Sequence, residues 1–243
     1  MTTQYVLLHT VDPANPDTWG DQHWEALRSW LDEAIGAGAL LAGDALCPET
    51  DATTVKVRGG QVVVTDGPFA DIKEWVSGYG ILQCASLEEA ERWAARHPAS
   101  WFAPTEVRAL VGEPIDFPPG PVPPPADGKT RYVMFVCIDP SATAQDAAGA
   151  MPIDQWVDET GSRGVRLFGS QLTEPAAARS VARLRNAQTV VTDGPFAETK
   201  EQIAGFDVLD CADLDEAIST AAAHPMSRAG LLEVRPVRRL EEV

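Results

Sequence analysis

His23 is the side chain of this sequence best suited to proton transfer. It lies in the stretch GDQHWEALRSW, residues 20 to 30, near the start of an expected helix. Histidine gains and loses a proton near neutral pH, and a neighbouring carboxylate orients the ring and stabilises its charged form. Asp66 and Asp44 are the candidate partners, and the sequence predicts acid–base catalysis by His23 with Asp66. The alternative is a partly exposed helix histidine without a chemical role.

A second candidate is the phrase Val-Thr-Asp-Gly-Pro-Phe-Ala, which occurs twice. It places Asp66 and Phe69 in one copy and Asp193 and Phe196 in the other. As binding residues, the two aspartates would point carboxylates into a cleft and the two phenylalanines would form apolar walls. The alternative is a structured turn, since Asp accepts backbone N–H bonds and Gly tolerates positive φ.

The residues that follow each phrase extend this candidate site. Lys73 and Glu74 in the first copy are matched by Lys200 and Glu201 in the second. A Lys-Glu pair suits an anionic ligand, although an exposed pair is worth under about 1 kcal/mol and needs no function. His9, on an expected strand, is a further residue predicted to line the cleft.

The repeated phrase belongs to a duplication of the whole chain. A shift of 127 residues aligns Asp66 with Asp193 and His97-Pro98 with His224-Pro225. Between the first strand and the repeated phrase the shift is 126, which aligns Trp30 with Trp156 and Gly43 with Gly169. The second copy has no histidine at the start of its first helix, so a His-Asp site is expected in the first copy alone. We predict domains at residues 1–111 and 130–243, joined by a proline-rich linker at 112–129.

The elements expected in one copy predict an α+β fold. Short apolar runs at 4–11, 39–46, 75–86 and 104–110 read as strands, and 53–67 reads as a hairpin that turns at Gly59-Gly60. Apolar spacing predicts helices in 18–38 and in 86–98, the latter with a capping box at Ser86 and Glu89. Helical spacing also predicts that Trp30 and Trp156 are core residues. Two helices on one face of an antiparallel sheet make a ferredoxin-like unit. We therefore expect two ferredoxin-like units packed sheet to sheet as an intramolecular pseudo-dimer, with a cleft between the sheets.

VTDGPFAETKEQIAGFDVLDCADLDEA, residues 191 to 217, resembles the signature of DGPF-domain proteins in the YCII-related family. The phrase from Thr65 onward matches it with small departures, so the resemblance covers both copies. It implies a dimeric α+β barrel, and it places His23 where proteins of this type carry a helix histidine proposed to pair with an aspartate. The resemblance also implies an association of some members with extracytoplasmic-function sigma factors.

Composition limits the partners of the chain. Its formal net charge is −17, which repels phosphate backbones and anionic lipid, so we expect no direct contact with nucleic acid or membranes. No apolar run is long enough to span a bilayer, and a cytoplasmic protein is expected. Cys47, Cys84, Cys137 and Cys211 form no metal-ligand pattern and are expected to be free thiols. We expect no metal and no cofactor.

These observations predict a protein that binds a small organic ligand in the cleft between its sheets, as a monomer that is itself a pseudo-dimer. Acid–base catalysis of an isomerase or lyase type is the enzymatic form of this hypothesis, because proton transfer needs no cofactor. The alternative is a non-enzymatic accessory or regulatory protein with a protein partner, for example one associated with a sigma factor.

Overall fold

The computed structural model describes the chain from residue 2 to residue 238 with several gaps. The described ranges are 2–12, 19–69, 75–116, 119–120, 122–139, 141–143, 145–184, 188–196 and 202–238. They divide into two compact units, each made of three segments of the chain. The first unit holds Met1–Ala45, Ile72–Val122 and Thr173–Glu198, and the second holds Leu46–Asp71, Pro123–Leu172 and Thr199–Val243.

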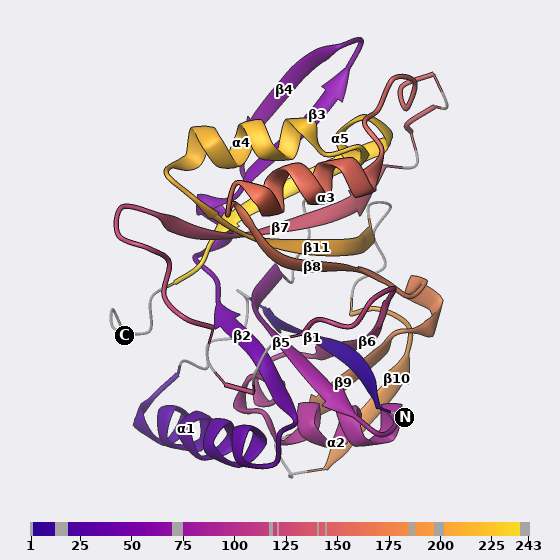
Figure 1. The fold of residues 1–243 in the computed structure, drawn as a ribbon. Coiled ribbons are helices and arrows are strands. Elements are labelled where there is room, and N and C mark those ends of the chain that lie inside the picture. Colours follow the sequence, from indigo (N-terminus) through magenta and orange to yellow (C-terminus); the bar gives the residue numbers. More distant parts are fainter. Residues whose placement is uncertain are drawn as a thin grey trace. The chain divides into compact units, whose positions relative to one another are not determined.

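The first unit is an antiparallel sheet with helices on one face (Figure 1). Its strands run in the order β2-β5-β1-β6-β9-β10. Their bounds are β1 Thr3–Val11, β2 Leu40–Ala45, β5 Trp75–Cys84, β6 Thr105–Val111, β9 Arg179–Arg183 and β10 Thr189–Asp193. The helices are α1 (Asp21–Gly36) and α2 (Leu87–Arg96), with the short turns η2 (Pro98–Trp101) and η3 (Pro175–Ala177) beside the strands.

The second unit repeats this plan. Its strands run in the order β8-β11-β7-β12-β3-β4. Their bounds are β3 Thr53–Arg58, β4 Gln61–Asp66, β7 Thr130–Ile138, β8 Arg166–Leu172, β11 Gln202–Cys211 and β12 Gly230–Pro236. Its helical elements are α3 (Ile153–Ser162), α4 (Leu214–Ala223), α5 (Met226–Ala229) and η1 (Glu49–Asp51).

Four strands and two helices of each unit form the ferredoxin-like motif. In the first unit the chain order β1-α1-β2-β5-α2-β6 gives the sheet order β6-β1-β5-β2, in which the fourth strand lies beside the first. The second unit has the same arrangement in β12-β7-β11-β8. The predicted α+β class and ferredoxin-like units are confirmed, as two such units in one chain.

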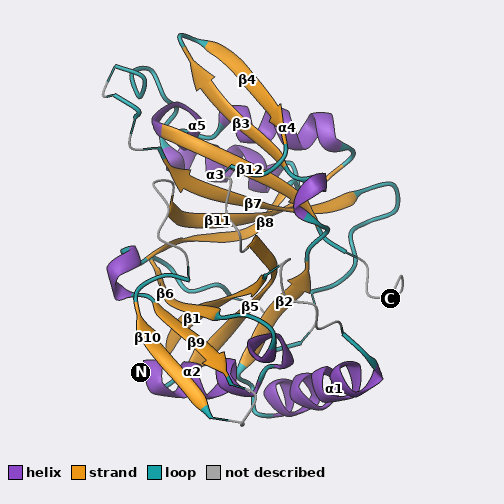
Figure 2. Cartoon of the chain, turned by 180° about the vertical axis from the view of Figure 1, so that it is seen from behind, coloured by secondary structure: helices purple, strands orange, loops and turns teal. Residues whose placement is uncertain are grey.

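The hairpin of each repeat completes the sheet of the unit built from the other repeat. Hairpin β3-β4 pairs with β12, where Thr54 lies opposite Glu233, and hairpin β9-β10 pairs with β6, where Ser180 lies opposite Glu106. Figure 2 shows β4 and β10 as the outer strands of these hairpins. The compact units therefore do not follow the repeats segment by segment, and the domain boundaries drawn from the sequence stay a prediction.

Apolar residues between the helices and one sheet face form the core of each unit. Trp30 on α1 packs edge-on against Trp93 on α2, and its indole N–H donates to the Trp93 carbonyl at 3.0 Å. Trp156 on α3 has the same role in the second unit, where its N–H donates to the Thr220 carbonyl at 3.1 Å. The expected core positions of Trp30 and Trp156 are confirmed.

Local signals in the sequence also match the structure. The hairpin turn at Gly59 and Gly60 has φ of 58° and 78°, a conformation that favours glycine. Ser86 Oγ accepts a hydrogen bond from the Glu89 N–H and begins α2. No helix within the described ranges has both the length and the apolar character needed to cross a membrane.

Candidate functional site

His23 lies in the first turn of α1, where its ring helps to begin the helix. The Gly20 N–H donates to His23 Nδ1 at 2.9 Å, so Nδ1 must be unprotonated. In a neutral ring the proton is then on Nε2, which can donate to an oxygen atom. The Gln22 side-chain amide lies 3.4 Å from Nε2. The ring is partly buried.

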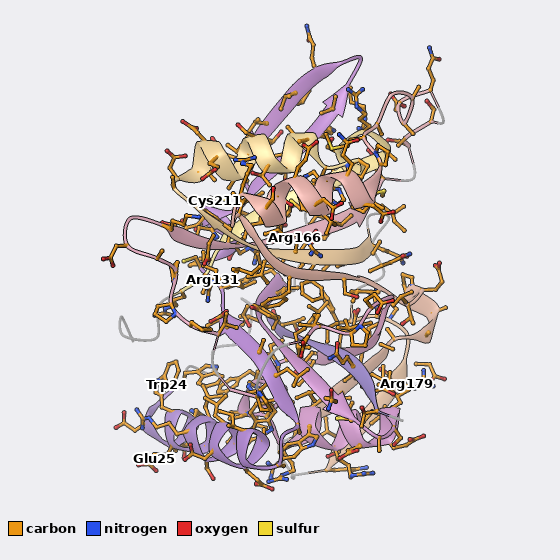
Figure 3. The ribbon with its side chains drawn as sticks, in the orientation of Figure 1. Trp24, Glu25, Arg131, Arg166, Arg179 and Cys211 are labelled. Atoms are coloured by element: carbon orange, nitrogen blue, oxygen red, sulfur yellow. The ribbon has the colours of Figure 1, made fainter. Side chains whose placement is uncertain are left out.

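Three aromatic rings lie around this imidazole, and a fourth packs against one of them. The centroid of the His23 ring lies 4.8 Å from that of Phe102 and 5.8 Å from that of Trp101, both in edge-on contact. Trp19 stacks on Phe102 at 5.6 Å and lies 4.9 Å from Trp24. All four aromatic residues are partly exposed, and Trp24 is labelled on α1 in Figure 3. We call Trp19, His23, Trp24, Trp101 and Phe102 the aromatic cluster.

A positive charge adjoins the aromatic cluster. The guanidinium carbon of Arg183, at the end of β9, lies 4.9 Å from the centre of the Trp101 ring. This distance is typical of a cation–π contact. The hairpin exchange causes this contact, because Arg183 is on the hairpin of the second repeat whereas Trp101 belongs to the first. Sequence analysis did not single out Arg183 or connect it with His23.

The repeated Asp-Gly turns are anchored in the same way in both units. The Gly67 N–H donates to the Ala52 carbonyl at 2.8 Å, and Thr54 Oγ1 donates to the Gly67 carbonyl at 2.9 Å. In the other copy Gly194 N–H bonds to the Ala178 carbonyl and Ser180 Oγ to the Gly194 carbonyl, each at 2.9 Å. The two glycines have φ of 101° and 96°.

A buried carboxylate then holds each loop at its phenylalanine. The Phe69 N–H donates to Glu233 Oε2 at 3.0 Å, and the Phe196 N–H donates to Glu106 Oε2 at 3.2 Å. The second oxygen of each glutamate pairs with the arginine two residues further on, Arg235 and Arg108 respectively. Both glutamates are at most 1% exposed. We call Glu106 and Glu233 the latch glutamates.

The aspartates of the repeated phrase lie at the surface. Asp66 ends β4 and is exposed, and the Asp193 side chain is 89% exposed with Arg179 Nη1 at 3.3 Å. Phe69 and Phe196 are partly buried. Lys73, Glu74, Lys200 and Glu201 lie outside the described residues. The ligand-binding roles of these residues stay predictions.

The two candidate carboxylate partners of His23 belong to different units. His23 and Asp44 are in the first unit and Asp66 is in the second. No carboxylate among the described residues of the first unit lies within 4.0 Å of a His23 ring nitrogen. Asp44, the other candidate partner, accepts a hydrogen bond from the Tyr79 hydroxyl at 3.0 Å. The catalytic pairing of His23 with Asp66 stays a prediction.

His9 lies in the core of the first unit, on the sheet face that carries the helices. Its ring stacks on His97 with 3.8 Å between centroids, and its Nδ1 is 3.2 Å from Thr105 Oγ1. Burial lowers the pKa of His9 to about 3, so this ring is neutral in the folded protein. Its predicted place as a cleft-lining residue stays untested, but its environment is apolar and buried.

The second unit has a buried polar cluster that sequence analysis missed. Arg166 Nε donates to Asp207 Oδ1 at 2.6 Å, and His224 Nε2 is 3.9 Å from Asp207 Oδ2. Burial raises the pKa of Asp207 to about 6 and lowers that of His224 to about 4, the latter with a smaller contribution from the Arg166 charge. The sequence does contain a sign of this cluster. The duplication aligns Asp207 with Gly80, so a charged residue stands in an apolar strand where the other repeat has glycine.

Metal binding and cysteine chemistry have little support among the described residues. No group of three or more potential metal ligands occurs among the described residues. Cys84 and Cys211 are free and buried, and burial raises the pKa of each thiol to about 12. Neither thiol is suited to act as a nucleophile.

Two ferredoxin-like units with exchanged hairpins and repeated Asp-Gly-Pro-Phe loops define a duplicated α+β protein. The model of the YCII-related domain matches the chain twice, at residues 3–110 and 130–241. The chain therefore belongs to the YCII-related family, and the resemblance drawn from the repeated phrase is confirmed.

An individual relative matches part of this chain. An uncharacterized protein of Rhizobium meliloti (strain 1021) is 48% identical over 67 residues, which are 26% of this chain and 52% of that protein. The match thus spans about half the length of the relative. A solved structure of a heme-binding protein from Thermus thermophilus aligns with 99% of this chain and 93% of its own, at 12% identity and a TM-score of 0.42.

Proposed function

We propose that this protein binds a small organic ligand at the aromatic cluster, with His23 as its polar contact. One observation carries the proposal: a histidine with a defined tautomer lies among three partly exposed aromatic rings, Trp19, Trp101 and Phe102. Partly exposed rings contact planar apolar groups, and the Nε2–H supplies a hydrogen bond to a carbonyl or hydroxyl oxygen. This is the usual composition of a small-molecule site, with apolar walls and few polar groups.

The asymmetry of the two repeats supports this placement. Six of the seven tryptophans belong to the first repeat, and the second has only Trp156, which is a core residue. At the positions of Trp101 and Phe102 the second repeat has Arg228 and Ala229. If the fold itself needed these rings, both repeats would have them. The additional tryptophans of the first repeat therefore favour a role in ligand binding.

Acid–base catalysis of an isomerase or lyase type is the enzymatic form of this proposal. His23 Nε2–H would donate its proton to the carbonyl oxygen of the ligand, while Asp66, the carboxylate that we propose as its partner, takes the proton from the neighbouring carbon to give the enol. Deuterium incorporation from D2O into an enolisable ligand, followed by NMR, measures this activity without knowledge of the product.

Ligand binding is tested by thermal shift and tryptophan emission with a panel of small organic acids, lactones and ketones. A ligand at about a hundredfold its Kd stabilises the fold by about 2.7 kcal/mol, which shifts Tm by a few degrees. His23→Gln removes the imidazole but leaves a residue type that supports capping at this position. Hits should bind wild type and lose affinity in His23→Gln.

The matched control is Gln155→Ala, in the first turn of α3 in the second unit. This exposed position should not affect ligand affinity. Hits that bind His23→Gln as tightly as wild type would overturn the placement of the ligand at the aromatic cluster.

The non-enzymatic alternative is a protein partner that pairs with an exposed sheet edge. Val62, Val63 and Val64 on β4 are 52%, 39% and 44% exposed, and exposed edge strands accept a further strand. A stoichiometric partner that is captured by wild type and lost from Val63→Lys would favour this function. A partner retained by Val63→Lys would count against it.

A further inference from the structure

Arg183 differs from Arg179, the other arginine of β9, in the group that its guanidinium contacts. Arg179, on the same strand, lies 3.6 Å from Glu91 and 3.3 Å from Asp193. Arg183 instead lies over the Trp101 ring, and none of the carboxylates in the described ranges is within 4.0 Å of it. Its side chain is partly buried. Within the described residues, the contact that positions this guanidinium is therefore the aromatic ring.

The composition of the chain makes this arrangement unusual. Asp and Glu number 36 against 19 Lys and Arg, so acidic partners are plentiful. Arginine presents its N–H donors in a planar fork that matches a carboxylate, and it stacks well on aromatic rings. A guanidinium that stacks on an aromatic ring and has no carboxylate partner among the described residues is therefore prepared to bind an incoming anion.

Arg183 and His23 both contact Trp101, so they belong to one site. The His23 ring meets the Trp101 ring edge-on, with centroids 5.8 Å apart, while the Arg183 guanidinium lies 4.9 Å from the ring centre. The site then offers flat apolar surface, one cation and one neutral N–H donor. These three features match different parts of one small molecule.

We propose that the ligand of the aromatic cluster is a planar organic carboxylate. Arg183 binds its carboxylate, the aromatic rings contact its flat apolar part, and His23 Nε2–H donates to an oxygen elsewhere on the molecule. This inference rests on the proposed function and adds the class of ligand and the residue that selects it.

The second unit has other residues at the three matching positions, and this predicts the stoichiometry. The hairpin register puts Val57 at the position of Arg183. The duplication aligns Trp101 with Arg228 and His23 with Gly149. One planar carboxylate should therefore bind per chain, although the fold is duplicated.

The test compares benzoate with benzamide, which have the same shape and differ in charge. Titrations followed by tryptophan emission and by saturation-transfer NMR cover the weak affinities expected of such small probes. Wild type should bind benzoate about tenfold more tightly than benzamide, the effect of a hydrogen-bonded charge pair. One molecule should bind per chain.

Three variants test whether Arg183 causes the preference for benzoate over benzamide. Arg183→Gln should abolish the preference and leave benzamide affinity unchanged, and Arg183→Lys should retain part of it because the charge remains. Arg28→Gln is the matched control: Arg28 is an exposed arginine of α1, and its replacement changes the net charge equally. It should leave both affinities unchanged.

The outcomes separate this inference from the proposed function. Equal binding of both probes to wild type, with loss of both in His23→Gln, would retain the ligand site and overturn the carboxylate. A preference for benzoate that survives in Arg183→Gln, or an equal loss of both probes in that variant, would also overturn the role of Arg183. Failure of wild type to bind either probe would count against the site itself.

Discussion

The backbone N–H of Phe69 donates a hydrogen bond to the buried Glu233 carboxylate, and Phe196 makes the same bond to Glu106. Each bond joins the loop of one repeat to the last strand of the other. The phenylalanine of the repeated phrase thus marks the end of an exchanged hairpin, where a carboxylate holds the loop in place. Much of the repeated phrase is explained by this anchoring, which both units need.

Removal of a latch glutamate should destabilise the fold strongly. Glu233→Ala or Glu106→Ala would leave a buried arginine without its carboxylate, a change that typically costs about 3–5 kcal/mol. Asp193→Asn, which affects an exposed ion pair, should cost less than about 1 kcal/mol. Urea unfolding of the three variants measures the free energies of unfolding. Similar losses for Glu106→Ala and Asp193→Asn would contradict the anchoring role.

The hairpin exchange predicts that a cut chain stays together. Each unit contains strands of both repeats, so cleavage between the repeats leaves every sheet complete. A protease site inserted after Asp127, which is exposed, allows a single cut. The cut protein should elute from a sizing column with the intact chain and separate only in denaturant. Separation of the halves in native buffer would contradict the exchange.

Sequence patterns predicted the local parts of this fold well. Ser86 and Glu89, the Gly59-Gly60 turn and the core tryptophans Trp30 and Trp156 depend on nearby residues or on helical period, which the sequence displays directly. The pairing partner of a hairpin is not local. The strand β6 or β12 offers the same edge to either hairpin, and apolar alternation does not distinguish the two copies.

The candidate site was predictable only in part. His23 was identified by residue type and by its place at a helix start, but Trp101 and Arg183 come from distant segments that the fold brings together. The surroundings of His9 and Asp207 in the core were equally hard to predict from the sequence. A polar residue in a strand suggests an exposed face, whereas both of these side chains are buried against partners that are far away in the sequence.

Gly169 should tolerate a side chain less well than its counterpart Gly43. A Cβ at Gly169 would collide with the Asp207 carboxylate and the Phe206 carbonyl, whereas at Gly43 it would meet the Tyr79 carbonyl at 2.9 Å. Overpacking of this kind costs about 1–3 kcal/mol, and we expect Gly169→Ala to lose more than Gly43→Ala.

The double variant Gly169→Ala/Asp207→Gly tests the cause of this difference. It removes the obstructing carboxylate and restores the glycine that the first repeat has at Gly80. Because Asp207→Gly also removes the ion-pair partner of Arg166, the double variant is compared with Asp207→Gly alone. Urea unfolding should show a smaller loss from Gly169→Ala in the Asp207→Gly background than in wild type. An equal loss in both backgrounds would show that the Asp207 carboxylate is not the obstacle.

Asp207 and His224 should give opposite pH dependences of stability. The Asp207 pKa is raised from 3.8 to about 6, so the folded state binds the proton more tightly and loses stability as pH rises from about 4 to 6. The His224 pKa is lowered from 6.5 to about 4, so the folded state loses stability as pH falls over nearly the same range. In the wild type these two contributions largely cancel.

Asp207→Asn removes the contribution of Asp207 and so reveals that of His224. His224→Asn does the reverse. Between pH 6 and pH 4, the free energy of unfolding of Asp207→Asn should fall relative to wild type by about 2 kcal/mol. The difference between pKa 3.8 and about 6 corresponds to about 3 kcal/mol in all, and part of it lies outside this interval. The free energy of unfolding of His224→Asn should rise relative to wild type over the same interval. Urea unfolding at half-unit pH steps measures both differences. Curves of both variants that run parallel to wild type would show that neither group is perturbed in the folded protein.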